Sequence, residues 1–175
     1  FLPTGEEALK QTVEFAKRMK QTGGLITPML GPHAPYTCPD KQLEKVIAVA
    51  HEIGVGIHIH LSETKKEVED SLAKYGETPI AHMKRLGLFA PASPRLRRMP
   101  AEKPLALAAH CVWATDDDIA ILAENKVGVA HNPGSNMKLA SGAMPTAKML
   151  AAGVPVGLGT DGAASNNNLD ILEEA

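Results

Sequence analysis

The chain has 175 residues, 44% of them hydrophobic, which is enough for one domain with a hydrophobic core. Its 18 Lys and Arg residues nearly balance 20 Asp and Glu residues, which argues against a nucleic-acid partner or an anionic membrane surface. No apolar stretch is long enough to cross a bilayer, and the two cysteines, Cys38 and Cys111, occur in unrelated contexts. We therefore expect no disulfide framework and a reducing, cytoplasmic setting.

The first half of the chain predicts helices and short strands in alternation. Residues 5–20 place apolar side chains at helical spacing, with acidic residues first and basic residues last, and Gly23 and Gly24 are expected to end this helix. Pro39 suits the first turn of a second helix, which Gly54 ends. The predicted elements are a helix over 5–20, a strand over 25–31, a helix over 38–54, a strand over 55–61, and helices over 62–76 and 78–88.

The second half continues this alternation. Ser62 is the candidate N-cap of the helix over 62–76, and Thr115 that of the helix over 114–126. Repeated strand–helix units predict a parallel sheet, either a doubly wound open sheet or part of a (β/α)8 barrel. The Pro-rich, basic segment 90–104 is predicted to be an exposed loop. The other predicted elements are a strand over 105–111, a helix over 114–126, a strand over 127–132, a loop over 133–145, a helix over 146–153 and a strand over 154–162.

A chemically capable side chain ends each of five successive apolar strands. In a barrel all strand ends meet at one rim, whereas in a doubly wound sheet only those near a switch point converge. The pattern therefore favours the barrel, and no strand is followed by a glycine-rich dinucleotide or phosphate motif. The five side chains are His33, His60, His110, His131 and Asp161.

Each of these residues also has a structural interpretation when taken alone. A single histidine at a strand end is often a hydrogen-bonded structural residue, and Asp161 could be a turn former. Glu63 could simply place a carboxylate in the first turn of a helix. His51 and His82 lie on predicted helices, and we interpret both as structural. What these interpretations do not explain is the recurrence of the pattern in five successive units.

Imidazole and carboxylate groups on one rim suit a divalent metal, zinc or iron, that activates water. His60 and Asp161 are the candidate ligands, and Glu63, His110 and Asp161 are candidates for the proton transfers and for stabilising an intermediate. His58 shares a strand face with His60 but lies deeper, so we expect it to pack in the barrel interior. Two ligands are fewer than the three that catalytic zinc normally has.

Five ordered motifs carry a family resemblance: "GPHAPYTC", "IHLSET", "AAHCVW", "HNPGSNMKLASG" and "GTDGAASNN". In this order they resemble the amidohydrolase superfamily, and within it the 5-methylthioadenosine/S-adenosylhomocysteine deaminase and chlorohydrolase group. The resemblance implies a (β/α)8 barrel with one metal, zinc or iron, and hydrolytic deamination of an aminopurine nucleoside. Chlorohydrolase activity, or aminohydrolase activity on a triazine, guanine or cytosine, is the alternative within the superfamily.

The resemblance also implies roles for individual residues. His60 corresponds to the metal ligand of the fifth strand and Asp161 to that of the eighth. Glu63 corresponds to the glutamate that carries a proton to the ring nitrogen, and His110 to the histidine that steers the attacking water and the intermediate. His33 corresponds to a histidine that contacts the substrate. The substrate is then a purine nucleoside or related heterocycle, with a homo-oligomer as a possible assembly.

The same resemblance implies that residues 1–175 are the C-terminal portion of the barrel domain, with strands four to eight. The first strands, their His-x-His ligand pair and a small β-sandwich have no counterpart in the chain. Five strands cannot close an eight-stranded barrel, so we expect the isolated chain to be inactive and to unfold readily or self-associate. A barrel fragment without catalytic function is the remaining alternative.

Overall fold

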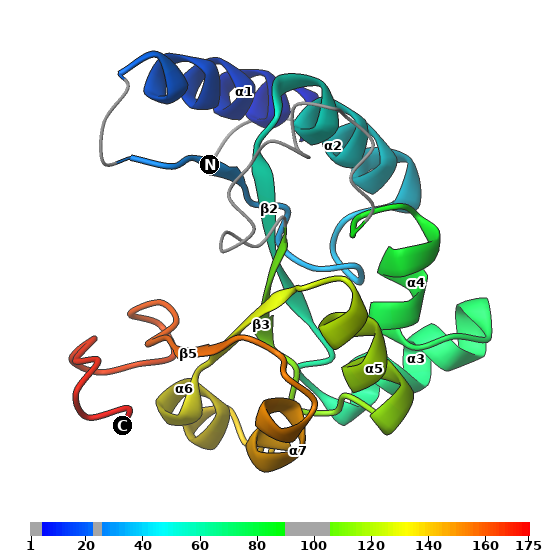
Figure 1. The fold of residues 1–175 in the computed structure, drawn as a ribbon, viewed down its shortest axis with the longest axis vertical. Coiled ribbons are helices and arrows are strands. Elements are labelled where there is room, and N and C mark those ends of the chain that lie inside the picture. The colour runs from blue at the N-terminus through cyan, green and yellow to red at the C-terminus, as the bar shows by residue number, and fades with distance from the viewer. Residues whose placement is uncertain (1–4, 23–25, 90–105) are drawn as a thin grey trace.

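A computed structural model of the chain describes residues 5–22, 26–89 and 106–175. They form a five-stranded parallel sheet in which the strands are neighbours in chain order (Figure 1). This order confirms the predicted partial barrel and removes the doubly wound alternative, whose strand order reverses at a switch point. The strands are β1 (Met29–Leu30), β2 (Gly56–Leu61), β3 (Ala106–His110), β4 (Gly128–His131) and β5 (Val156–Leu158).

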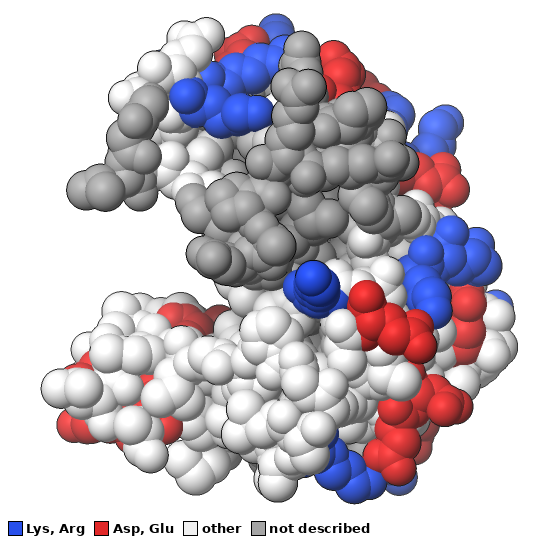
Figure 2. Space-filling model, viewed as in Figure 1, with Lys and Arg blue, Asp and Glu red and all other residues white. Residues whose placement is uncertain are grey.

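Helices alternate with the strands, and several lie together on one side of the sheet (Figure 1). Lys, Arg, Asp and Glu side chains mix over these outer helices in the view of Figure 2. No helix in the described ranges is long and apolar enough to cross a membrane. The helices are α1 (Gly5–Gln21), α2 (Asp40–Ile53), α3 (Lys65–Tyr75), α4 (Pro79–Arg85), α5 (Asp116–Glu124), α6 (Pro133–Lys138) and α7 (Thr146–Ala151).

Alternation along β2 separates the core from the functional side of the sheet. Ile57, Ile59 and Leu61 are almost fully buried in the core shared with the helices. His58 and His60 alternate with these residues and so point to the opposite side of the sheet. His58 is exposed there, because the described strands leave that side of the sheet open. The expectation that it packs in the interior of a closed barrel stays a prediction.

Most of the predicted helix ends are confirmed. Gly54 and Gly76 have φ angles of 66° and 73° and end α2 and α3 in the left-handed conformation that glycine adopts without steric cost. Thr115 caps α5 in a complete capping box with Asp118. Ser62 is not the cap of α3; the cap is Thr64, which accepts a hydrogen bond from the Glu67 N–H.

One predicted loop contains a helix. Residues 133–145 begin with α6, because Pro133 occupies a first-turn position where its missing N–H costs nothing. The predictions for Gly23, Gly24 and the segment 90–104 lie outside the described residues.

A buried polar cluster joins α2, α3 and α4. His82 is fully buried, with Nδ1 2.9 Å from Glu77 Oε1 and Nε2 3.2 Å from Asp40 Oδ1. The ring of Tyr75 stacks on that of His82 at 3.9 Å between centroids, and its hydroxyl donates to Asp40 at 2.8 Å. Arg85 Nε donates to Glu77 at 2.6 Å. Both imidazole nitrogens face carboxylates, which confirms the structural interpretation of His82.

Candidate metal centre and hydrolytic site

Three of the predicted side chains converge where strands end at the rim. Ligand atoms of His60, His110 and Asp161 all lie within 4.8 Å of one another. His60 Nε2 is 4.0 Å from Asp161 Oδ1, and His110 Nε2 is 3.9 Å from Asp161 Oδ2. His60 and Asp161 offer a ring nitrogen and a carboxylate oxygen, both atom types that zinc binds. The sheet register brings the two histidines to neighbouring positions at the ends of β2 and β3, because Leu61, next to His60, pairs with His110.

A backbone carbonyl fixes which nitrogen of His60 is available. His60 Nδ1 lies 2.7 Å from the carbonyl oxygen of His33, which also accepts the backbone N–H of His60 at 3.0 Å. A carbonyl can only accept, so Nδ1 carries the proton and Nε2 keeps its lone pair in the neutral ring. Metal-binding histidines are typically held in this way by a partner on the other nitrogen. Nε2 of His60 therefore fits the role of a metal ligand.

A side-chain amide binds Nδ1 of His110, as the carbonyl of His33 binds Nδ1 of His60. The Nδ1 atom of His110 lies 2.8 Å from Asn136 Oδ1, and the His110 side chain is almost fully buried. Donation to this oxygen leaves Nε2 directed at Asp161. The backbone of His110 is strained, with φ at 72° in the region that non-glycine residues rarely adopt. Such strain often accompanies functional sites, where the surrounding structure enforces it.

Two hydroxyl groups hold the carboxylate of Asp161. Ser135 Oγ and Ser165 Oγ each donate to Asp161 Oδ2 at 2.7 Å. Burial alone would raise the pKa of Asp161, but the hydrogen bonds from Ser165, Ser135 and the Gly162 N–H outweigh it and lower the pKa. The carboxyl is therefore an anion at neutral pH. Oδ1 faces His60 and supplies the charge that a divalent cation needs.

Glu63 lies beyond the end of β2, in the turn that leads to α3. Only 9% of its surface is exposed, and Ser141 Oγ donates to its Oε1 over 3.4 Å. The carbonyl of Ser141 in turn accepts the indole N–H of Trp113 at 2.7 Å. The turns that follow β2, β3 and α6 thus meet around this carboxylate.

The other two predicted histidines, His33 and His131, are not among the three clustered side chains. The ring of His33 lies 4.9 Å from that of His60 between centroids, and its Nδ1 is 2.8 Å from Thr37 Oγ1. His33 is exposed beside the cluster, where it can meet a bound molecule. His131 lies outside the ligand cluster; its Nδ1 has no hydrogen-bond partner among the described residues, and burial lowers its pKa.

Comparison with known proteins places this geometry in a family. The model of the Amidohydrolase family matches residues 3–175. The chain belongs to the amidohydrolase family. It is 55% identical over 170 residues to the 5-methylthioadenosine/S-adenosylhomocysteine deaminase of Desulforudis audaxviator, covering 97% of the chain and 36% of that protein.

Two further relatives agree with this amidohydrolase assignment. The 5-methylthioadenosine/S-adenosylhomocysteine deaminase of Dictyoglomus thermophilum is 56% identical, with 96% of the chain and 37% of that protein covered. The crystal structure of an adenosine deaminase from Xanthomonas campestris with bound zinc superposes with a TM-score of 0.84 at 37% identity, covering 97% of this chain and 35% of that one. The chain thus spans little more than a third of the length of these relatives.

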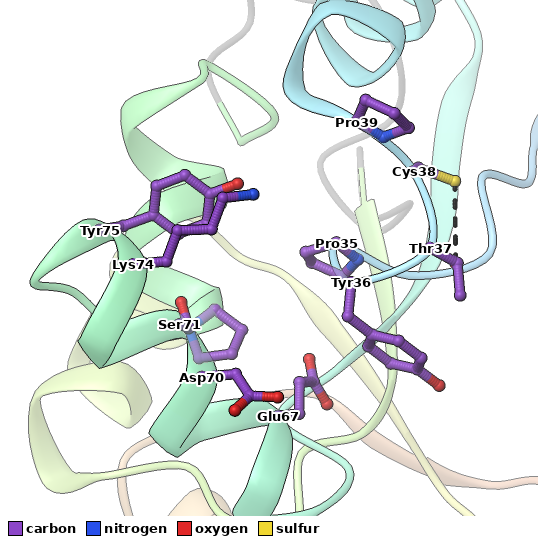
Figure 3. Close-up of a pocket in the computed structure, with 11 residues that line it drawn as sticks. Pro35, Tyr36, Thr37, Cys38, Pro39, Glu67, Asp70, Ser71, Lys74 and Tyr75 are labelled. Atoms are coloured by element: carbon purple, nitrogen blue, oxygen red, sulfur yellow. Dashed lines mark hydrogen bonds between the residues drawn. The ribbon is translucent and has the colours of Figure 1, made fainter.

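A separate cavity of about 340 Å³ lies outside the cluster (Figure 3). It lies between the loop that follows β1 and helix α3, with Tyr36 and Cys38 on the loop and Glu67 and Tyr75 on the helix. None of the three clustered side chains lines it. The cavity of this amidohydrolase chain is therefore not the place where the clustered ring nitrogens and carboxylate act.

Several residues of the site were not predicted from the amidohydrolase motifs. Ser135 and Asn136 lie in "HNPGSNMKLASG", and Ser165 lies in "GTDGAASNN", four residues after Asp161. The i, i+4 spacing of Asp161 and Ser165 was the only local signal available. The contacts of Ser135 and Asn136 cross between strands, so no spacing in the sequence reveals them.

Proposed function

We propose that the protein containing this chain is a metal-dependent hydrolase that deaminates an aminopurine nucleoside of the S-adenosylhomocysteine or 5-methylthioadenosine type. The observation that carries the proposal is the convergence of His60, His110 and Asp161, with the Nδ1 atom of each ring already bound. Relatives at 55% and 56% identity that are named deaminases of these two nucleosides support the substrate class.

We further propose that residues 1–175 are the C-terminal portion of a barrel domain. The sequential parallel strands and the coverage of 36% and 37% of the two relatives support this. The remaining strands would supply the further ligands that a catalytic metal needs, since His60 and Asp161 are two of at least three. Both cysteines of the described chain are free thiols, which supports a reducing, cytoplasmic setting.

His60 Nε2 and Asp161 Oδ1 are the atoms proposed to hold one divalent cation, zinc in the first place and iron as the alternative. A cation bound there would make a water molecule acidic enough to attack at neutral pH. Asp161 also carries the negative charge that accepts a proton from this water. Ser135 and Ser165 occupy its Oδ2, so Oδ1 remains directed at the cluster.

Glu63 is proposed to carry a proton to the ring nitrogen next to the carbon under attack. Protonating that nitrogen draws electron density from the carbon, so that a C–O bond can form. The contact with Ser141 holds this carboxyl in a buried position, three residues after His60. Asp161 would then pass the water proton to the exocyclic amine, and the hydroxyl of the intermediate would give its proton back to Glu63. Breaking the C–N bond releases ammonia and leaves the oxo product.

His110 and His33 are proposed to orient the reactants. His110 Nε2 points into the cluster and can hydrogen-bond the attacking water and the tetrahedral intermediate. The buried contact with Asn136 keeps this ring from turning away. His33 presents an exposed imidazole beside His60, where it can contact the heterocycle.

A substrate panel on the full-length, metal-replete protein tests the proposal. We expect ammonia release to be fastest with S-adenosylhomocysteine, 5-methylthioadenosine or adenosine, compared with guanine, cytosine and a chlorotriazine. Glu63→Gln should lower kcat by about 10²–10⁴-fold, the usual worth of a general acid–base group, with metal content unchanged. If chloride release from the chlorotriazine were faster than ammonia release from the nucleosides, the substrate would be a chlorotriazine and not an aminopurine nucleoside. A protein without bound metal or turnover would contradict the hydrolase proposal.

A further inference from the structure

The turn that carries Glu63 is held in a strained conformation. Ser62 is fully buried and has a φ angle of 50°, in the left-handed region that a non-glycine residue enters only at a free-energy cost. Such a conformation persists only where surrounding contacts enforce it. The direction of the Glu63 side chain depends on this turn, because the two residues are neighbours in it.

The carboxylate of Glu67 supplies the strongest of these contacts. Its Oε1 accepts the N–H of Ser62 at 3.0 Å and its Oε2 accepts the N–H of Glu63 at 2.8 Å. Both oxygens are thus used on the backbone of the turn, and only 6% of Glu67 is exposed. Burial raises the pKa of Glu67 to about 7, while the hydrogen bonds from Glu63 and Ser62 oppose that rise. No step of the proposed reaction uses this buried acid.

The turn is held from its other side as well. The carbonyl of Ser62 accepts the backbone N–H of Trp113 at 2.9 Å, and the indole of Trp113 holds Ser141. Ser141 is the residue whose hydroxyl reaches Glu63. The contacts of Glu67 on the N–H groups and of Trp113 on the carbonyl therefore leave the turn little freedom to rotate.

A similar arrangement in α5 serves as a comparison. Asp118 accepts the N–H of Thr115 at 3.0 Å with Oδ2 and completes a capping box, while its Oδ1 accepts the hydroxyl of Thr78, the cap of α4. Glu67 occupies the equivalent third position of α3, whose cap is Thr64, but it reaches further back, to Ser62 and Glu63. The longer side chain places its hydrogen bonds on the turn that carries the acid–base group.

We propose that Glu67 is a positioning residue that acts through Glu63, by fixing the Ser62–Glu63 turn with two backbone hydrogen bonds. The inference rests on the proposed function, in which Glu63 carries the proton. Without both bonds the turn relaxes, and the carboxyl of Glu63 loses its alignment with the reacting atoms. Misplacement of a reacting group by about 1 Å can lower a rate by roughly 10²-fold.

Glu67→Gln in the full-length protein is the variant that removes one of the two acceptors. The amide nitrogen that replaces one oxygen is a donor and cannot accept a backbone N–H. Gln has nearly the size of Glu, and Glu67 borders the cavity of Figure 3, so the variant fits without steric conflict. Asp118→Asn is the matched control, since it makes the same carboxylate-to-amide change in the capping box of α5.

We expect Glu67→Gln to lower kcat roughly 10–100-fold, with KM within about threefold, and with metal content and Tm like those of Asp118→Asn. Asp118→Asn should keep the wild-type kcat. In a Glu63→Gln background the added Glu67→Gln change should lower kcat no further, because the two residues act as a unit. If Glu67→Gln fails to fold, Glu67→Asp, which keeps the charge but shortens the reach, is measured by the same criteria.

Two results would overturn the inference. One is a wild-type kcat in Glu67→Gln. The other is an equal loss in the wild-type and Glu63→Gln backgrounds, which would mean that Glu67 acts independently of Glu63. A wild-type protein that deaminates nothing, or a Glu63→Gln variant as active as wild type, overturns the proposed function and the inference with it. These last results are seen with Glu67 intact, so the two failures are distinguishable.

Discussion

Among the described residues, two clusters of histidine and carboxylate differ in which ring nitrogens remain free. At the rim, His60 and His110 each have one nitrogen bound to a neutral oxygen and the other directed at Asp161 across about 4 Å. In the helical layer, both nitrogens of His82 face carboxylates at 2.9 and 3.2 Å. A ligand needs the free nitrogens of the first arrangement, whereas the second is complete without one.

Backbone strain separates the same two regions. His110 and Asp161 have φ angles of 72° and 62°, as expected where a site forces side chains to converge. His82 lies within the regular helix α4 and its backbone is unstrained. Residue composition alone does not distinguish a site from a structural cluster. The distinction lies in the ligand atoms that remain unused.

The largest expected effect is the loss of metal in His60→Ala. The zinc affinity of the full-length variant should fall by more than about 10²-fold, and turnover should be lost with it. Removing an outer partner of a ligand costs less, about 10–100-fold. The Tm of His60→Ala in the presence of chelator should match that of the wild type. Inductively coupled plasma mass spectrometry measures the metal, and a normal zinc content in this variant would remove His60 from the ligand set.

His82→Ala should show the reverse pattern. Removing a fully buried ring that bridges two carboxylates should lower the free energy of unfolding by roughly 2–4 kcal/mol. Zinc content per folded chain should stay that of the wild type. Urea denaturation measures the change, with His51→Ala on α2 as the control for a helical histidine that is only partly buried. If the His82→Ala variant lost zinc and kept the stability of the wild type, His82 would be a metal ligand and not a structural residue.

A smaller effect is expected at the hydroxyl groups that hold Asp161. Ser135→Ala and Ser165→Ala each remove one 2.7 Å hydrogen bond to Oδ2. Each should weaken zinc binding by about 10–100-fold, because outer partners orient the ligand and lower its pKa. Competition with a zinc-binding dye measures the affinity. Wild-type affinity in both variants would show that Asp161 needs no support from these serines.

The smallest expected effect is the pH dependence that the His82 cluster gives to stability. Burial would raise the pKa of Asp40 and Glu77, but hydrogen bonds from Tyr75 and His82 to the first, and from Arg85 and His82 to the second, lower both. Their stabilisation is present above the ordinary values of 3.8 and 4.5, and is lost as the pH falls below these through the folded-state values.

Substituting both carboxyls tests this pH dependence. Asp40→Asn with Glu77→Gln should flatten the fall in Tm between about pH 5 and pH 3, the range in which ordinary carboxyls titrate. Asp116→Asn, which removes an exposed ion pair with Lys148, is the control and should leave the slope intact. An unchanged slope in the double variant would assign the acid sensitivity to other carboxyls.

The sequence predicted those features that local pattern determines. The strand ends that carry His60, His110 and Asp161 follow from apolar runs, and the ends of α2 and α3 follow from Gly54 and Gly76. The helix α6 was not predicted, because Pro and Gly within a run of polar residues are also typical of a loop.

The supporting contacts of the site could not be predicted from the sequence either. Asn136 and Ser135 act through partners that tertiary structure brings near, at 2.8 and 2.7 Å, and no periodicity encodes these partners. Glu67 binds N–H groups only five and four residues before it, but the pattern of helix caps predicted Ser62 as the cap and gave no sign of these bonds. The difference between His60 and His82 was inferred from strand and helix position alone. Only the hydrogen bonds show why one ring can accept a ligand and the other cannot.

Anomalous diffraction at the zinc edge, from crystals of the full-length protein, tests the site most directly. We predict one peak within bonding distance of His60 Nε2 and Asp161 Oδ1, and none beside His82. A zinc-replete protein whose only peak lies away from His60 and Asp161, or one that shows no peak, would contradict the assignment of this rim as the metal centre.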